Sequence, residues 1–183
     1  MPCADTLGPA LLSRARNAIA ERFDRARVPE PAHPALRLPG ATFVTLHRDG
    51  RLRGCIGRLR AECALDDDVR ANARGAAFED PRFAPLLAAE WRGLSVEVSL
   101  LEPPQPLPVR DEADARGQLE PGVDGVLLEW RGARATFLPQ VWAQLPEPAD
   151  FLRELKRKAG LDAGFWHAEL RLARYRVRRF TEG

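Results

Sequence analysis

One cysteine in this sequence lies in a setting that could make its thiol reactive. Cys55 stands in the stretch GRLRGCIGRL, residues 50–59, where arginines surround it. A thiol becomes nucleophilic near neutral pH when a nearby cation stabilises its thiolate. Side chains alternate between the two faces of a strand, so if Leu52 and Ile56 face a core, Cys55 shares the opposite face with Arg53. The pattern therefore makes Cys55 and Arg53 candidate catalytic residues.

Two glycines flank the cysteine, and each has two explanations. Gly54 and Gly57 remove side chains on both sides of Cys55, so a substrate or another backbone could approach closely. The same glycines could mark a bulge or a packing contact. Cys55 could likewise be a small apolar residue of a buried strand, because free cysteine is among the most buried residue types. The residues alone leave both interpretations open.

The strand that pairs with the cysteine decides whether a base faces the thiol. Residues 41–57 predict a β-hairpin that turns at residues 49–50, an Asp-Gly pair. A two-residue loop places Val44 and Leu46 on the cysteine face. One extra loop residue places Phe43, Thr45 and His47 there instead, because a one-residue slip moves every side chain to the other face. Only the second register offers a histidine base.

Further polar candidates lie outside this hairpin. Asp80 and Arg82 belong to the tetrad DPRF, where the arginine could bind an anion or only tie down its loop with the aspartate. Glu97 alternates with serines along a predicted strand, which suits either an acid at a substrate site or a plain solvent face. Three adjacent aspartates, residues 66–68, could suggest a metal, but carboxylates in the first turn of a helix favour its free N–H groups and its dipole without one.

Composition excludes several classes of function. The chain has 28 basic and 26 acidic residues and a net charge of +2, which is not the field of a nucleic-acid-binding protein. Its three cysteines form no C-x-x-C pair and its three histidines are far apart in sequence, so we expect no metal site. No dinucleotide-binding, P-loop or serine-hydrolase motif is present, and we expect no cofactor.

The cysteines and the distribution of apolar residues indicate the cell compartment of the protein. Dispersed thiols fit a reducing environment better than a disulfide framework. No stretch approaches the roughly 20 apolar residues of a membrane helix, and charged residues stand where a signal peptide needs its apolar run. We therefore expect a cytoplasmic protein without a membrane partner.

Strands separated by helices, without regular β-α-β alternation, predict an α+β fold with mainly antiparallel sheet and flanking helices. The expected helices are residues 6–26, 65–80 and 149–159, with a short one beginning at Pro85. The expected strands are 41–47, 51–57, 94–101, 125–130, 133–138 and 170–180. We expect one domain over residues 1–183. If it forms two lobes, the proline-rich run at 102–112 is where their edge would fall.

Several blocks of this sequence resemble a known family. LRGCIG at residues 52–57 looks like the defining hexapeptide of the AMMECR family, whose bacterial and archaeal branch is called AmmeMemoRadiSam system protein A. The blocks TFVTL, AAFEDPRF, LSVEVSLL, FLPQVW and KAGL occur in the order that the family has them. The hexapeptide and the tetrad at residues 80–83 match without substitution.

The resemblance implies an α+β fold with a larger and a smaller lobe and the hexapeptide near a cleft between them. It also implies an association with a Memo-like protein and a radical SAM enzyme, and it gives no settled reaction. We therefore expect a site centred on Cys55, with Arg53 as a catalytic candidate, that binds or modifies a small or anionic substrate. The substrate-binding candidates are Gly54, Gly57, Asp80, Arg82 and Glu97. The alternative is a non-catalytic scaffold, or a partner that presents a substrate to those two proteins.

Overall fold

The computed structural model describes residues 6–182, so Cys3 lies outside the described residues. The chain divides into two compact units, one reaching to Leu101 and resuming at Arg178, and a smaller one over Glu102–Val177. The first unit holds α1 (Leu7–Ala20), β1 (Pro39–Arg48), β2 (Arg51–Gly57), β3 (Cys63–Ala64), α2 (Leu65–Phe78), β4 (Leu94–Leu101) and nearly all of β9 (Val177–Thr181). The second holds β5 (Gln105–Leu107), α3 (Glu112–Gln118), β6 (Gly125–Trp130), β7 (Ala133–Phe137), α4 (Pro148–Lys158) and β8 (Arg171–Tyr175). Short 3-10 turns lie at Glu21–Phe23, Pro34–Arg37, Ala88–Glu90 and Pro139–Ala143.

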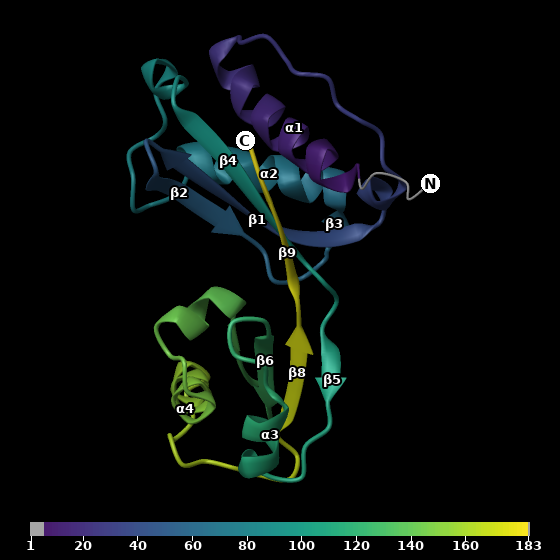
Figure 1. The fold of residues 1–183 in the computed structure, drawn as a ribbon, viewed down its shortest axis with the longest axis vertical. Helices are drawn as coiled ribbons and strands as arrows, with labels where there is room; N and C mark the ends of the chain where they lie inside the picture. Colours follow the sequence, from purple (N-terminus) through teal and green to yellow (C-terminus); the bar gives the residue numbers. More distant parts are fainter. Residues whose placement is uncertain (1–5, 183) are drawn as a thin grey trace. The chain divides into compact units, whose positions relative to one another are not determined.

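The first unit is a sheet whose strands run in the order β2-β1-β4-β9, with β3 also paired to β1. Strand β1 is antiparallel to β2, β3 and β4. The second unit has a sheet in the order β5-β8-β6-β7, of which β5, β8 and β6 are labelled in Figure 1. The predicted α+β class with antiparallel sheets is confirmed.

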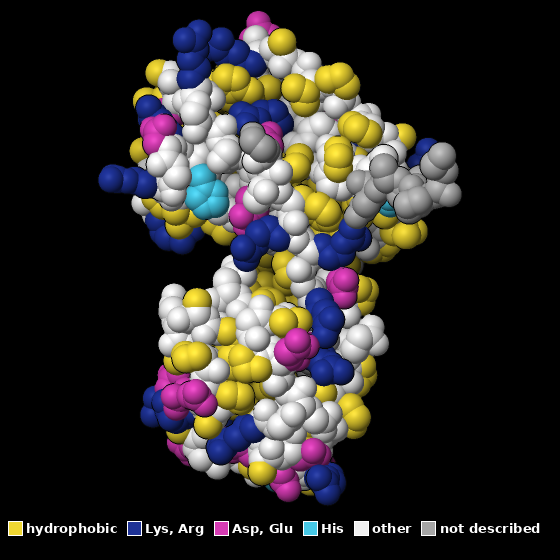
Figure 2. All heavy atoms as spheres, in the orientation of Figure 1, with side chains coloured by type: hydrophobic (Ala, Val, Ile, Leu, Met, Phe, Trp, Pro, Cys, Tyr) yellow, Lys and Arg dark blue, Asp and Glu magenta, His cyan; other side chains and the backbone are white. Residues whose placement is uncertain are grey.

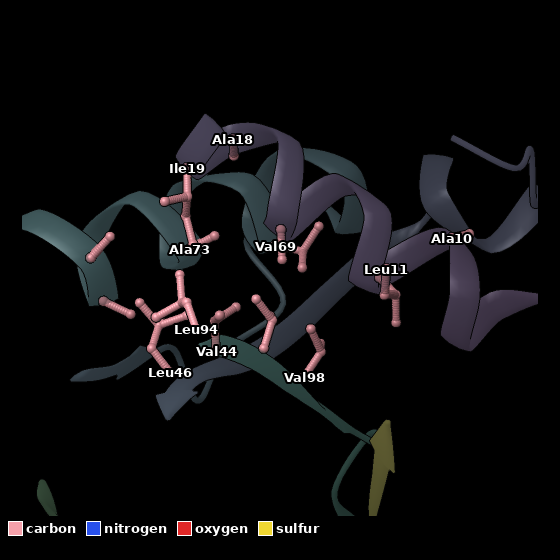
Figure 3. Packing of buried hydrophobic residues seen from close by; sticks show 14 of the residues in the cluster. Ala10, Leu11, Ala18, Ile19, Val44, Leu46, Val69, Ala73, Leu94 and Val98 are labelled. Carbon is pink, nitrogen blue, oxygen red and sulfur yellow. The ribbon is translucent and has the colours of Figure 1, made fainter. Parts of the chain in front are cut away.

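Both helices of the first unit pack on one face of its sheet. Figure 3 shows side chains of α1 and α2 above those of β1 and β4. Leu11 and Ile19 from α1 and Val69 from α2 are fully buried against Val44 and Val98. The helical and two-residue periods of the sequence bring these apolar residues to one interface. The opposite face of the sheet therefore carries the alternate residues of β1, β2 and β4.

The second unit has its own apolar core. Helix α4 buries Phe151, Leu152 and Leu155, and the Trp142 ring stacks on Phe151 with centroids 3.7 Å apart. The α4 chain turns away at Gly160, whose φ of 79° is the left-handed conformation that glycine supplies after a helix. The predicted helix at residues 149–159 is thus confirmed.

The Asp49-Gly50 turn is a two-residue loop, the shorter of the two loops that the sequence left open. Both residues have positive φ, 51° and 75°, the combination of a type I′ turn that matches the twist of a hairpin. Arg48 then pairs with Arg51. Below this point a bulge shifts the register, and Arg53 is the extra residue on β2. This bulge decides which side chains face Cys55.

Four predicted elements differ from the structure. The helix expected over residues 6–26 ends at Ala20 and is followed by a 3-10 turn. The last strand, expected at 170–180, is interrupted at Arg176, and its halves β8 and β9 belong to different sheets. The helix expected from Pro85 is only a 3-10 turn at Ala88–Glu90, too short for the cooperativity that an α-helix needs. The spacer at 102–112 contains β5, which tolerates its proline because it lies at a sheet edge.

Charges are intermixed on the face of the molecule that Figure 2 draws. On the face drawn in Figure 2, basic and acidic side chains lie among one another on both units, in keeping with the net charge of +2. Among residues 6–182, no helix is both long and apolar enough to cross a membrane.

Candidate functional site

Cys55 lies on the sheet face opposite the two helices. Its neighbours Gly54 and Ile56 point the other way, toward α2: a Cβ on Gly54 would meet the Ala76 carbonyl, and Ile56 packs on Gly75. Alternation then turns the Cys55 side chain away from the helices. It is half-buried, so its thiol is not part of the apolar core.

Thr45 is the residue directly opposite Cys55 on β1. Its hydroxyl oxygen lies 3.2 Å from the Cys55 sulfur, within hydrogen-bonding distance. His47 lies on the same face but pairs with Leu52, beyond the bulge. The strands therefore adopt the register that places Thr45 and His47 on the cysteine face. A bulge at Arg53 produces this register, whereas the sequence predicted it from a longer loop.

The backbone of Cys55 is held by the tetrad that follows α2. Strand β2 is at the edge of its sheet, so the outer N–H and C=O groups of Cys55 have no neighbouring strand. The Cys55 N–H donates to Asp80 Oδ2 at 2.8 Å, and Arg82 Nη2 donates to the Cys55 carbonyl at 3.2 Å. A carboxylate and a guanidinium thus take the places that a further strand would fill.

Asp80 and Arg82 also bind each other. Arg82 donates through Nε and Nη2 to the two carboxylate oxygens at 3.0 and 2.7 Å, a bidentate geometry that favours both charges. The Arg82 guanidinium holds the pKa of the buried Asp80 carboxyl far below its usual range. The pKa of Arg82 is raised, mainly by Asp80 and in smaller part by the nearby Cys55 thiol group. The Arg82 side chain is still 54% exposed.

The Arg53 guanidinium is engaged by Glu90, and its catalytic role beside Cys55 stays a prediction. Arg53, the extra residue of the bulge, binds Glu90 through Nε and Nη2, at 2.8 and 3.0 Å. This ion pair lowers the pKa of Glu90 to about 2. Leu52, expected in the core, is 43% exposed and opposes His47. A bulge reverses the alternation of the residues before it, and this reversal moves the Leu52 side chain.

Glu97 does lie on the Cys55 face. It pairs with Thr45 from the other side of β1, and Arg179 of β9 approaches its carboxylate with Nε 3.3 Å from Oε1. Cys55, Thr45, Glu97 and Arg179 thus form one row across four adjacent strands. Glu97 belongs to the surroundings of the thiol, separated from it by Thr45.

The two glycines beside Cys55 have packing roles. A Cβ on Gly54 would lie 2.0 Å from the Ala76 carbonyl oxygen, and one on Gly57 would lie 2.3 Å from the Phe43 ring. Gly54 allows α2 to approach β2. Gly57 allows an aromatic ring of β1 to lie over the strand. Contact of either glycine with a substrate stays a prediction.

Two of the three aspartates at the start of α2, Asp66 and Asp68, have hydrogen-bond partners outside its first turn. Asp66 accepts from Arg70 at 3.0 Å, and the buried Asp68 accepts from the backbone and hydroxyl of Thr42 at 2.8 and 2.7 Å. All three lie in the first turn of α2, as predicted, but none makes a side-chain N-cap hydrogen bond. Within residues 6–182, no cluster of three or more histidine, cysteine, aspartate or glutamate side chains could hold a metal.

Comparison with known proteins shows the family of this chain. The AMMECR1 family model matches residues 12–180. This chain belongs to the AMMECR1 family. A curated protein of Methanothermobacter thermautotrophicus is 37% identical over 186 residues, covering 99% of this chain and 97% of the relative. One from Thermofilum pendens is 34% identical over 96% of this chain and 89% of the relative.

A solved structure has the same fold. The crystal structure of an uncharacterized protein from Pyrococcus horikoshii, PH0010, is similar with a TM-score of 0.80 and 30% identity, covering 100% of this chain and 94% of that chain. The hexapeptide and tetrad of this AMMECR1-family chain therefore lie in a family domain, and the structure joins them through Cys55, Asp80 and Arg82. Sequence reasoning missed Thr45 as a partner of the thiol, although the second register already placed it on that face.

Proposed function

We propose that this AMMECR1-family protein binds a small anionic substrate at a site made of the Cys55 thiol and the Arg82 guanidinium. The observation that carries the proposal is that Arg82 donates to the Cys55 carbonyl while more than half of its side chain stays exposed. A guanidinium recognises carboxylate or phosphate groups through several N–H donors. A substrate anion on Arg82 would therefore bring the rest of the substrate beside the thiol.

The arrangement also supports a chemical step. A Cys55 thiolate can add to an electrophilic carbonyl carbon of the bound substrate, forming a C–S bond while the π electron pair moves to the oxygen. The thiol proton completes the adduct, so the addition needs no oxidant. Arg82 would compensate the negative charge that develops on the oxygen. We infer that the Memo-like and radical SAM proteins supply or consume this substrate in the cytoplasm, where the free thiols of Cys55 and Cys63 would stay reduced.

A second candidate is a non-catalytic partner that presents a substrate to those proteins. It is favoured by the position of His47, which opposes Leu52 and not Cys55, so a histidine base is not directly across from the thiol. Arg82 would then hold the anion without a covalent step.

A reconstitution experiment tests the proposal and separates the two candidates. The protein is incubated with the Memo-like protein, the radical SAM protein and a metabolite extract, then analysed by mass spectrometry. We expect a substrate-dependent adduct on Cys55 and loss of turnover in Cys55→Ser, with unchanged turnover in the matched variant Cys63→Ser. Full turnover in Cys55→Ser would overturn the proposed site. Turnover that needs Cys55 but never yields an adduct would favour presentation without a covalent step.

Removal of the Arg82 charge should slow the alkylation of the Cys55 thiol. We expect Arg82→Gln to reduce the rate at which iodoacetamide alkylates Cys55 at pH 7 by about two- to fivefold, the range of partly exposed charge pairs. The exposed Arg60→Gln is the matched control and should leave the rate unchanged. Cys63 is an internal reference, because burial and the nearby Asp68 raise the pKa of its thiol. An equal rate in Arg82→Gln and Arg60→Gln would contradict a role of Arg82 at the thiol.

A further inference from the structure

Thr45 is in a position to control the Cys55 thiol from the neighbouring strand. The backbone N–H and C=O of Cys55 point away from β1, toward Asp80 and Arg82. Cys55 and Thr45 are therefore a non-hydrogen-bonded antiparallel pair, the kind in which opposite side chains come closest. The distance of 3.2 Å from the Thr45 hydroxyl oxygen to the Cys55 sulfur agrees with this geometry.

Resting on the proposed Cys55 site, we propose that Thr45 is a positioning residue that fixes the direction of the thiol and stabilises its thiolate. A hydroxyl accepts from an S–H group and donates to a thiolate, so it can hold the sulfur in both protonation states. When the thiolate forms, the hydroxyl hydrogen bond favours the charged species. Thr45 thus lowers the cost of producing the nucleophile without touching the substrate.

Surrounding contacts hold the Thr45 and Cys55 side chains next to each other. Threonine is branched at Cβ and has few χ1 conformations in a strand, and Thr45 lies between β2 and β4, opposite Cys55 on one side and Glu97 on the other. The Asp80 and Arg82 contacts fix the Cys55 backbone. A clamp on the cysteine backbone and a stiff partner opposite its side chain together define where the sulfur lies.

The charged groups around Thr45 leave its hydroxyl available to the sulfur. Glu97 lies across from Thr45 but is engaged by Arg179, with Nε 3.3 Å from the carboxylate. A carboxylate that is paired on its far side competes less for the hydroxyl proton. The row from Cys55 to Arg179 therefore alternates a thiol, a hydroxyl and an ion pair, and Thr45 is the member that contacts the reactive atom.

Paired substitutions test this role. Thr45→Val keeps the branched shape and removes the hydroxyl, whereas Thr45→Ser keeps the hydroxyl. In a Cys3→Ser background, iodoacetamide alkylation of Cys55 is measured by peptide mass spectrometry from pH 6 to pH 10. We expect Thr45→Val to slow alkylation at pH 7 by about two- to fivefold, because less of the Cys55 thiol is ionised without the hydroxyl hydrogen bond. This range already allows for the greater nucleophilicity of the thiolate of a less acidic thiol. Its pH profile should move to higher pH, and Thr45→Ser should stay close to wild type.

Three results would overturn the inference. They are an unchanged pH profile in Thr45→Val, an equal loss in Thr45→Ser, or an equal change at Cys63, since the last would indicate general loosening of the fold. The measurement needs no substrate, so it can fail while the Cys55 site stands. Conversely, turnover that survives Cys55→Ser would overturn the proposed function even if Thr45 controls the thiol.

Discussion

Gly54→Ala is expected to destabilise the first unit by about 3 kcal/mol or more, the upper part of the range for overpacked positions. A Cβ at this position would lie 2.0 Å from the Ala76 carbonyl oxygen. This oxygen belongs to the backbone of α2 and cannot rotate away as a side chain end could. The helix would have to move off β2, which would uncover part of the core between them.

The control for this substitution is Gly117→Ala in α3, where no other atom lies within 4 Å of the added carbon. Alanine in a helix is favoured over glycine by roughly 0.5–1 kcal/mol, so this variant should be as stable as wild type or slightly more. Urea denaturation followed by circular dichroism gives both values. Hydrogen exchange should show deprotection of Gly54→Ala within residues 6–101. Equal stability of the two variants would show that α2 does not require glycine at this contact.

Asp80→Asn is expected to cost about 1–3 kcal/mol at pH 7, because it leaves the Cys55 N–H and the Arg82 guanidinium with a weaker, neutral partner. The amide keeps the shape of the side chain, so the loss measures charge and hydrogen bonding and not a cavity. The amide hydrogen of Cys55 should also exchange faster. Asp162→Asn, at an exposed position, is the matched control and should change stability little.

The same variant gives a test by pH. The pKa of Asp80 is lowered in the folded protein, so the unfolded chain binds its proton first as the pH falls. The carboxylate therefore stabilises the fold above the unfolded pKa of about 4 and loses this contribution below it, as the pH approaches the folded pKa. The stability difference between wild type and Asp80→Asn should shrink from pH 7 to pH 3 in urea titrations. A difference that stays constant over this range would show that the Asp80 charge does not hold the edge of β2.

Elements with a strong local pattern were predictable. The alternation of residues 94–101 predicts strand β4, and its Val96 and Val98 are buried as expected. The Asp-Gly turn predicts the hairpin, since positive φ at both positions suits these two residues. Local backbone preference and hydrophobic period decide such features, so they need no knowledge of distant contacts.

The end of the chain shows what a local pattern cannot decide. Residues 170–180 alternate like one strand, yet β8 and β9 pair in different sheets. Alternation reports that side chains face two environments but not which strand lies alongside. The strand with which each half pairs depends on the unit to which that half belongs.

At the site, the sequence by itself determined that Cys55 lies on a strand among glycines and arginines and that the hexapeptide and tetrad belong to a family domain. Only the tertiary structure decided which arginine contacts the Cys55 backbone. One bulge turns Arg53 to Glu90, while the loop after α2 brings Arg82 to Cys55 from 27 residues away. The physical reason is that a bulge changes the face of every residue before it, and the unpaired edge of β2 must find hydrogen-bond partners wherever the fold supplies them.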